Sequence, residues 1–195
     1  YDMGPSALKR TRLEGMRREG LLRENVSDVP ETGTYWADLT DDQRRLESRY
    51  MEIYAAMVES IDVNTARVID YLRDRGDLEN TIIFFMSDNG AEGIDRNALV
   101  QRTGSTSPEQ FRENLLATLE EANRDLSQMG SSDSFLTYGR RWAEAATAPG
   151  QLFKGHTYEG GVRAPAFISG PGVLGSRIVH SKTWVRDVMP TLLEM

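Results

Sequence analysis

Apolar residues between positions 51 and 72 recur every three to four residues, which is the spacing of one face of a helix. Thr40 and Gln43 match the capping box with which many helices begin. Gly76 is the residue type that most often ends a helix. We therefore predict a long helix over residues 41–75 with one buried stripe. The stripe consists of Met51, Tyr54, Val58, Ile61, Thr65, Val68 and Leu72.

Two short apolar segments, residues 81–86 and 166–169, have the composition of strands. The first is apolar without alternation, which is typical of a strand covered on both faces, as in parallel sheets flanked by helices. A long helix, a short turn and then such a strand predict an α/β layered fold. We expect helices flanking a mostly parallel sheet that is incomplete in this chain.

Three further helices are predicted, over residues 5–18, about 107–130 and 185–193, while residues 131–150 are expected to be rich in loop. Pro5 suits the first turn of the first helix, and Gly20 suits its end. The candidate buried residues of that helix are Leu8, Leu13 and Met16.

Composition narrows the classes of function. The chain has 195 residues, enough for one domain, and a net charge of -7 that argues against a general nucleic-acid partner. Cysteine is absent, which excludes disulfides, thiolate chemistry and cysteine-based zinc sites within these residues. No apolar run is long enough to span a bilayer, so no membrane partner is expected. The compartment stays open between cytoplasm and periplasm.

The two ends of the sequence look internal to a longer protein. Tyr1 directly precedes a helical pattern, and Met195 lies inside another one. We expect residues 1–195 to form a single partial domain. An acidic protein that handles an anion must also gather positive charge at its site, from lysine, arginine or a metal ion.

The turn Ser87-Asp88-Asn89-Gly90 directly follows the predicted strand over residues 81–86. Ligands of open α/β sheets bind at the carboxyl ends of strands. An aspartate and an asparagine there offer hard oxygen ligands, which suit calcium or magnesium. The same residues are also common in ordinary turns, where they cap backbone groups. From the residues alone, the two interpretations stay open.

A second polar segment, residues 154–165, carries a lysine, an arginine and adjacent glycines. Lys154 is a flexible point charge that can reach an anionic oxygen. Arg163 can bind an anion or pair with a carboxylate such as Glu159. The alternative to an anion site is a surface loop with a salt bridge.

Taken together, these segments resemble the sulfatases of the alkaline-phosphatase superfamily, specifically bacterial arylsulfatases. The resembling residues are 50–59, Asp62, 80–93, Trp142, Ala143, 154–165 and 187–194. The resemblance runs through most of the chain in the same order and spacing. It implies a partial alkaline-phosphatase-like sandwich that forms one segment of the sulfatase catalytic domain.

The resemblance also implies roles for three residues. Asp88 and Asn89 match ligands of a divalent cation, usually calcium, with magnesium as the alternative. Lys154 matches a lysine that contacts the sulfate group. The nucleophile of such enzymes is a formylglycine made from cysteine or serine in a Cys/Ser-x-Pro-x-Arg motif, and this sequence contains no such motif. We therefore expect the formylglycine, with the other cation ligands, in an upstream segment.

The histidines and several aromatic residues are weaker candidates. His156 lies two residues from Lys154, so it is a candidate second substrate contact or proton donor, although a local packing role is the more common case. His180 has no supporting context. The aromatic residues Tyr35, Trp36, Tyr138 and Trp142 line a substrate pocket or, more commonly, pack in the core.

The first functional hypothesis is a sulfuric ester hydrolase of arylsulfatase type, whose substrate is a small sulfate ester. Residues 1–195 alone should be inactive because the nucleophile lies outside them. One alternative is a phosphodiesterase or phosphonate hydrolase of the same superfamily, and another is a non-catalytic remnant or interaction module. Apolar faces and strand edges left without their partners also predict self-association.

Overall fold

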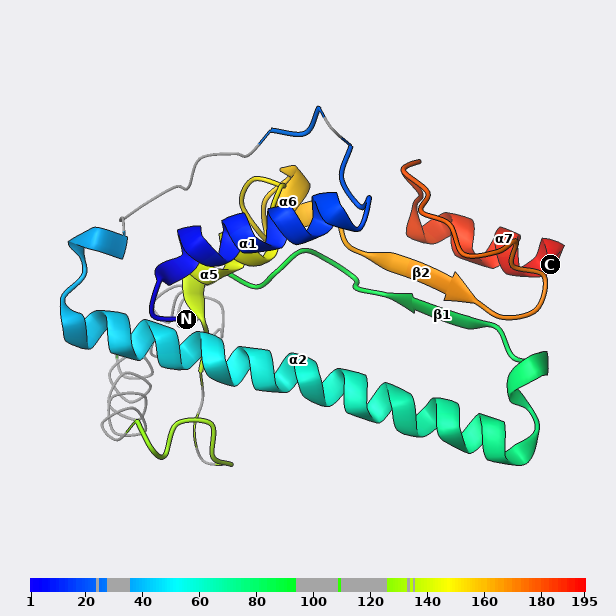
Figure 1. Cartoon of the computed structure of the whole chain (residues 1–195), viewed down its shortest axis with the longest axis horizontal. Helices are drawn as coiled ribbons and strands as arrows, with labels where there is room; N and C mark the ends of the chain where they lie inside the picture. The colour runs from blue at the N-terminus through cyan, green and yellow to red at the C-terminus, as the bar shows by residue number, and fades with distance from the viewer. Residues whose placement is uncertain (24, 28–35, 94–108, 110–125, 133, 135) are drawn as a thin grey trace.

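The structure is a computed structural model that describes residues 1–23, 25–27, 36–93, 109, 126–132, 134 and 136–195. A long helix, α2 (Asp41–Arg75), runs across the lower part of the view in Figure 1, with shorter helices over its N-terminal half and the paired strands toward its C-terminal end. The α-helices are α1 (Gly4–Arg18), α2 (Asp41–Arg75), α5 (Gly139–Ala146), α6 (Glu159–Val162) and α7 (Val188–Glu194). The strands are β1 (Ile83–Met86) and β2 (Ala166–Ser169), and the 3-10 turns are Trp36–Asp38, Leu78–Asn80 and Val185–Asp187.

The predicted ends of α2 are confirmed. The Thr40 hydroxyl accepts a hydrogen bond from the Gln43 backbone N–H at 3.3 Å, and the Gln43 side chain accepts one from the Thr40 N–H at 2.9 Å. These bonds satisfy two donors that the start of a helix otherwise leaves unpaired. Gly76 ends the helix with a φ of 75°, a left-handed conformation that glycine adopts without steric cost.

The core of the described residues lies where the first half of α2 meets α5 and the loops around it. Its buried members are Tyr50, Met51, Met129, Tyr138, Trp142, Ala143 and Phe153. The Trp142 ring is fully buried and meets the Tyr1 and Trp36 rings edge-on. Residues 139–146, expected to be loop, are therefore helical because α5 buries Trp142 and Ala143.

Of the other three predicted helices, two are confirmed and the third lies mostly outside the described residues. The first is confirmed as α1, where Leu13 is buried while Leu8 and Met16 are half-buried. The last is confirmed as a 3-10 turn continuing into α7. The predicted helix over 107–130 lies mostly outside the described residues.

The prediction that the whole α2 stripe is core is wrong for its second half. Val58, Ile61 and Val68 are 46%, 54% and 60% exposed. Within the described residues, the buried positions of α2 are Ser48, Tyr50 and Met51. Apolar periodicity identifies the face that is suited to burial, but burial itself requires a partner surface, and the described elements provide none there.

The two predicted strands are confirmed, and with them the α/β class of the fold. They pair antiparallel, so a mostly parallel arrangement would have to involve further strands. The expectation that both faces of β1 are covered is wrong for the described residues, since Phe84 and Met86 are exposed. In the register of the pair, Met86 lies opposite Ala166. The turn after β1 therefore meets the segment that leads into β2.

None of the helices that the structure describes is long and apolar enough to cross a membrane.

Candidate functional site

The two polar segments singled out from the sequence lie side by side. The turn that follows β1 runs along the loop that precedes β2, and backbone hydrogen bonds join them. The bonds are Ser87 N to Pro165 O at 3.3 Å, Gly90 N to Gly161 O at 3.0 Å and Lys154 N to Ala91 O at 2.9 Å. The structure therefore brings Asp88, Asn89 and Lys154 to one junction.

Close packing of backbone explains the glycines at this junction. A Cβ atom on Gly90 would lie 1.7 Å from the Gly160 carbonyl oxygen. A Cβ on Gly160 would lie 1.9 Å from the Leu152 oxygen, and one on Gly161 would lie 2.1 Å from the His156 oxygen. All three distances are far below van der Waals contact. The glycines therefore serve close approach of the two segments, which only a residue without a side chain allows.

The turn itself leaves oxygen atoms available. The Ser87 hydroxyl donates to the Asn89 carbonyl oxygen at 2.9 Å, and the Asn89 side-chain amide donates to the Gly90 carbonyl oxygen at 3.0 Å. The Asn89 side chain therefore uses its N–H group to stabilise the turn. Its side-chain oxygen takes no part in that hydrogen bond and can face a cation. Asp88 is exposed and makes no hydrogen bond or ion pair with the described residues.

These two side chains fit a hard divalent cation as part of its ligand set. A carboxylate and an amide oxygen are the ligand types that calcium and magnesium prefer. Calcium takes about six to eight oxygens, so other ligands would have to join them. The described residues contain no group of three or more acidic or histidine side chains that could hold a metal ion by itself.

Lys154 lies half-buried at the junction, on the loop that faces the turn. Its ammonium is 3.3 Å from a carboxylate oxygen of Glu92, which lies two residues after the turn that carries Asp88. Glu92 was not a candidate from the sequence. Its position just after the polar turn was the available signal, but a contact with Lys154 depends on how the two segments approach each other.

His156 packs on a neighbouring ring. Its backbone N–H donates to the Phe153 carbonyl oxygen at 3.2 Å, and its ring meets the Phe153 ring edge-on at 5.0 Å. Phe153 is buried beneath the junction, where Gly93 leaves room for its ring and the Arg140 guanidinium lies 5.4 Å from the ring centre. These contacts support the packing role, and a substrate contact by His156 stays a prediction.

Arg163 pairs with a carboxylate, as the salt-bridge alternative predicted. Its guanidinium lies 3.4 Å from Glu159, and Lys182 lies 2.8 Å from the other oxygen of the same carboxylate. The hydrogen bond from Lys182, with smaller contributions from both cations, lowers the pKa of Glu159. The backbone carbonyl oxygen of His180 accepts a long hydrogen bond of 3.5 Å from the Arg23 guanidinium.

Comparison with known proteins identifies the chain. The family model described as Sulfatase matches residues 24–195. The chain belongs to the sulfatase family. Along its whole length, this sulfatase chain is 41% identical to an uncharacterized sulfatase of Schizosaccharomyces pombe and 27% identical to an arylsulfatase of Klebsiella aerogenes. The alignments cover 34% and 40% of those proteins, so the chain spans between a third and two-fifths of their length.

The aromatic candidates of this sulfatase are packing residues where the structure describes them. Trp142 and Tyr138 are buried, and Trp36 packs half-buried against them, while Tyr35 lies outside the described residues. The Tyr138 ring stacks on Tyr54 at 4.2 Å. Burial raises the pKa of the Tyr138 phenol, and the nearby Tyr54 and Glu92 raise it further.

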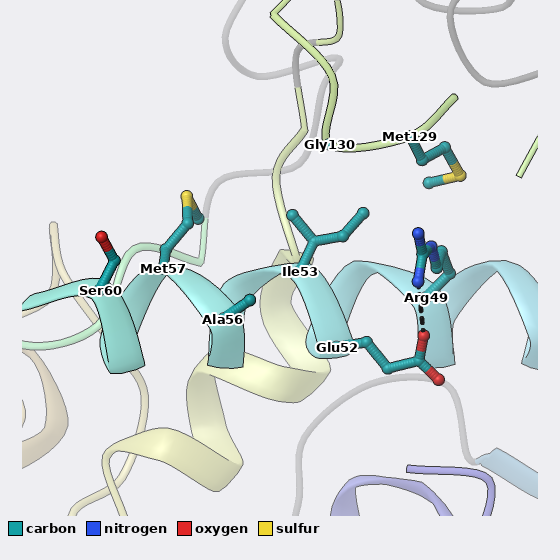
Figure 2. A pocket seen from close by; sticks show the side chains of 8 residues that line it. All are labelled: Arg49, Glu52, Ile53, Ala56, Met57, Ser60, Met129 and Gly130. Atoms are coloured by element: carbon teal, nitrogen blue, oxygen red, sulfur yellow. Dashed lines mark hydrogen bonds and ion pairs between the residues drawn. The ribbon is translucent and has the colours of Figure 1, made fainter. Parts of the chain in front are cut away.

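A shallow groove on α2 lies apart from the junction. Figure 2 shows its lining, in which Arg49 and Glu52 form an ion pair of 3.0 Å. The residues around it are Arg49, Glu52, Ile53, Ala56, Met57, Ser60, Met129 and Gly130. None of the candidate site residues Asp88, Asn89, Lys154 and His156 lines this groove.

Proposed function

We propose that this sulfatase segment takes part in the hydrolysis of aryl sulfate esters. In this proposal, Lys154 contacts the sulfate group while Asp88 and Asn89 provide two ligands of a calcium ion, with magnesium as the alternative. The observation that supports it most is the 2.9 Å hydrogen bond from Lys154 N to Ala91 O. That bond joins the backbone of the lysine to the turn that carries both oxygen ligands.

The charges at the junction suit a sulfate ester. Its hydrolysis moves negative charge among the sulfate oxygens and onto the leaving oxygen, and fixed positive charge stabilises that change. The Lys154 ammonium can donate hydrogen bonds to a sulfate oxygen. Bound calcium would supply further positive charge beside the same group. Because Lys154 is paired with Glu92 and Asp88 is a further carboxylate, the bound cation would have to supply most of that positive charge.

In this proposal, the nucleophile is a formylglycine that lies outside residues 1–195. The 195 residues contain no cysteine, and no serine with proline and arginine at the required spacing. The chain also spans only 34% and 40% of the two curated relatives. Residues 1–195 alone should therefore bind a cation and an anion weakly and turn over no substrate.

The aryl character of the substrate rests on one relative. The Klebsiella aerogenes protein, at 27% identity, is named an arylsulfatase. A sulfate ester with a good aryl leaving group, such as 4-nitrophenyl sulfate, is therefore the first substrate to test. The choice of a sulfate ester over a phosphate or phosphonate substrate rests on membership of the sulfatase family.

The experiment measures kcat/KM for hydrolysis of 4-nitrophenyl sulfate. The enzyme is expressed from the coding sequence of residues 1–195 together with the coding sequence that flanks it. Lys154→Ala and Asp88→Ala should each lower kcat/KM by at least about 100-fold, as expected when a charge-stabilising group is removed. Lys182→Ala is the matched control, because it removes a lysine that pairs with Glu159 on the surface. Equal activity of Lys154→Ala and Lys182→Ala would contradict the role of Lys154. Turnover of phosphate esters without sulfate esters would contradict the substrate.

A further inference from the structure

The ion pair between Glu92 and Lys154 changes the net charge that a bound anion would meet at the junction. The two charged atoms are 3.3 Å apart, and the side chains are 39% and 41% exposed. The carboxylate reaches Lys154 from the residues that directly follow the turn carrying Asp88 and Asn89. Backbone hydrogen bonds from Gly90 N to Gly161 O and from Lys154 N to Ala91 O hold this stretch against residues 154–165. The pairing therefore follows from the same junction that defines the site.

This arrangement lets Lys154 bind an anion without leaving Glu92. A lysine ammonium has three N–H donors, so one can remain on the carboxylate while the others meet a substrate oxygen. The carboxylate charge then stays beside the bound anion. Lys154 and Glu92 together contribute no net charge, whereas the lysine alone would contribute one positive charge.

The charge of the substrate determines how strongly the Glu92 carboxylate weakens its binding. A sulfate monoester carries one negative charge, because its single acidic proton is lost at all ordinary pH values. A phosphate monoester carries close to two negative charges above its second pKa of about 6. A nearby carboxylate therefore repels the phosphate ester about twice as strongly as the sulfate ester.

We propose that Glu92 is a specificity-determining residue whose carboxylate, beside Lys154, favours monoanionic sulfate esters over dianionic phosphate esters. The inference rests on the proposed sulfate contact of Lys154. Glu92 does not act on the reacting atoms. It sets the net charge that the anion meets.

The size of the effect follows from the distance. An anion oxygen bonded to Lys154 lies within about 6 Å of the Glu92 carboxylate, since a hydrogen bond of about 2.9 Å adds to the ion-pair distance of 3.3 Å. Across that distance, one extra unit charge changes binding roughly three- to tenfold for an effective dielectric constant between about 80 and 40. Removing the Glu92 charge should therefore shift relative affinity toward the dianion by roughly three- to tenfold.

The test is a titration of the 195-residue chain at pH 8 with methyl sulfate and, separately, methyl phosphate. Backbone amide signals of Lys154 and Ala91 report binding, and the ratio of the two dissociation constants is compared between variants. Glu92→Gln should shift that ratio toward methyl phosphate by roughly three- to tenfold, and 0.5 M NaCl should shrink the shift because salt screens it. Glu92→Asp, which keeps the charge, should stay close to the wild-type ratio.

Glu52→Gln is the matched control. It removes a carboxylate from an ion pair with Arg49 of 3.0 Å and comparable exposure, away from the junction. Equal shifts in the Glu52 and Glu92 variants would overturn the inference, since net charge alone would then explain them. An unchanged ratio in Glu92→Gln, with both anions still shifting the Lys154 signal, would overturn the inference and leave the proposed function standing. If neither anion shifts the Lys154 signal in the wild type, the sulfate contact and the inference both fail.

Discussion

Replacing Gly90 by alanine should separate the two segments of the junction. A Cβ atom at Gly90 would lie 1.7 Å from the Gly160 carbonyl oxygen and 3.1 Å from Gly161 Cα. Both neighbours are backbone atoms, so no side-chain rotation relieves the overlap. Reaching an ordinary contact of 3.4 Å requires the segments to move apart by about 1.7 Å, which breaks the hydrogen bond from Gly90 N to Gly161 O.

The cost has two parts. Losing the hydrogen bond leaves a buried backbone group unpaired, which costs about 1–3 kcal/mol. Forcing an extra methyl group into a tightly packed region costs about 1–3 kcal/mol more. The free energy of unfolding of Gly90→Ala should therefore fall by about 2–6 kcal/mol.

Urea unfolding followed by circular dichroism measures this change. Gly15→Ala is the control, because Gly15 lies within α1 and its added Cβ would meet no atom closer than 3.7 Å. That substitution should stabilise the chain by about 0.5–1 kcal/mol through the better helix propensity of alanine. A Gly90→Ala variant that unfolds at the wild-type urea concentration would refute the close approach.

Three other properties are predicted. Thr40→Ala should lower the free energy of unfolding by about 1 kcal/mol in the same urea assay, because the α2 cap is lost; an unchanged midpoint would speak against the capping box. Burial raises the pKa of the Tyr138 phenol, so the folded state disfavours its ionised form. The free energy of unfolding should therefore stay constant below the ordinary tyrosine pKa of about 10 and fall as pH rises from there toward the folded-state pKa. Thermal unfolding between pH 8 and 12 checks this, and Tyr138→Phe should flatten the decline; an equal decline in both proteins would exclude Tyr138 as the cause. Sedimentation velocity should detect self-association through the exposed α2 stripe, weakened by Val68→Lys; a wild-type chain that stays monomeric at about 100 μM would count against it.

Local sequence signals predicted the elements whose causes are local. The Thr40 and Gln43 box and Gly76 fix the ends of α2 because the bonds they make lie within a few residues. Helix α5 escaped prediction because it has only eight residues and depends on the burial of Trp142 and Ala143 in a core built from distant segments. Short helices of this kind gain most of their stability from tertiary packing.

The same distinction applies to the candidate site. From the residues alone, Asp88 and Asn89 were candidate cation ligands or parts of an ordinary turn, and Lys154 was a candidate anion contact. The family resemblance then implied a role for each of the three. The ion pair with Glu92 could not be predicted, because it depends on the register of β1 and β2 and on how the Gly90 and Gly160 backbones touch. Likewise, periodicity marked the α2 stripe as apolar but could not supply the surface that covers it.

Under the proposed function, Asp88 and Asn89 hold a hard cation beside Lys154. The most direct test is a titration of the 195-residue chain with Mn²⁺, an oxygen-seeking paramagnetic cation that broadens nearby amide signals. We expect early broadening at Asp88 and Asn89 together with Lys154 across the junction, and we expect Asp88→Ala to abolish it. Broadening that begins at other acidic residues, or that persists in Asp88→Ala, would contradict the proposed site.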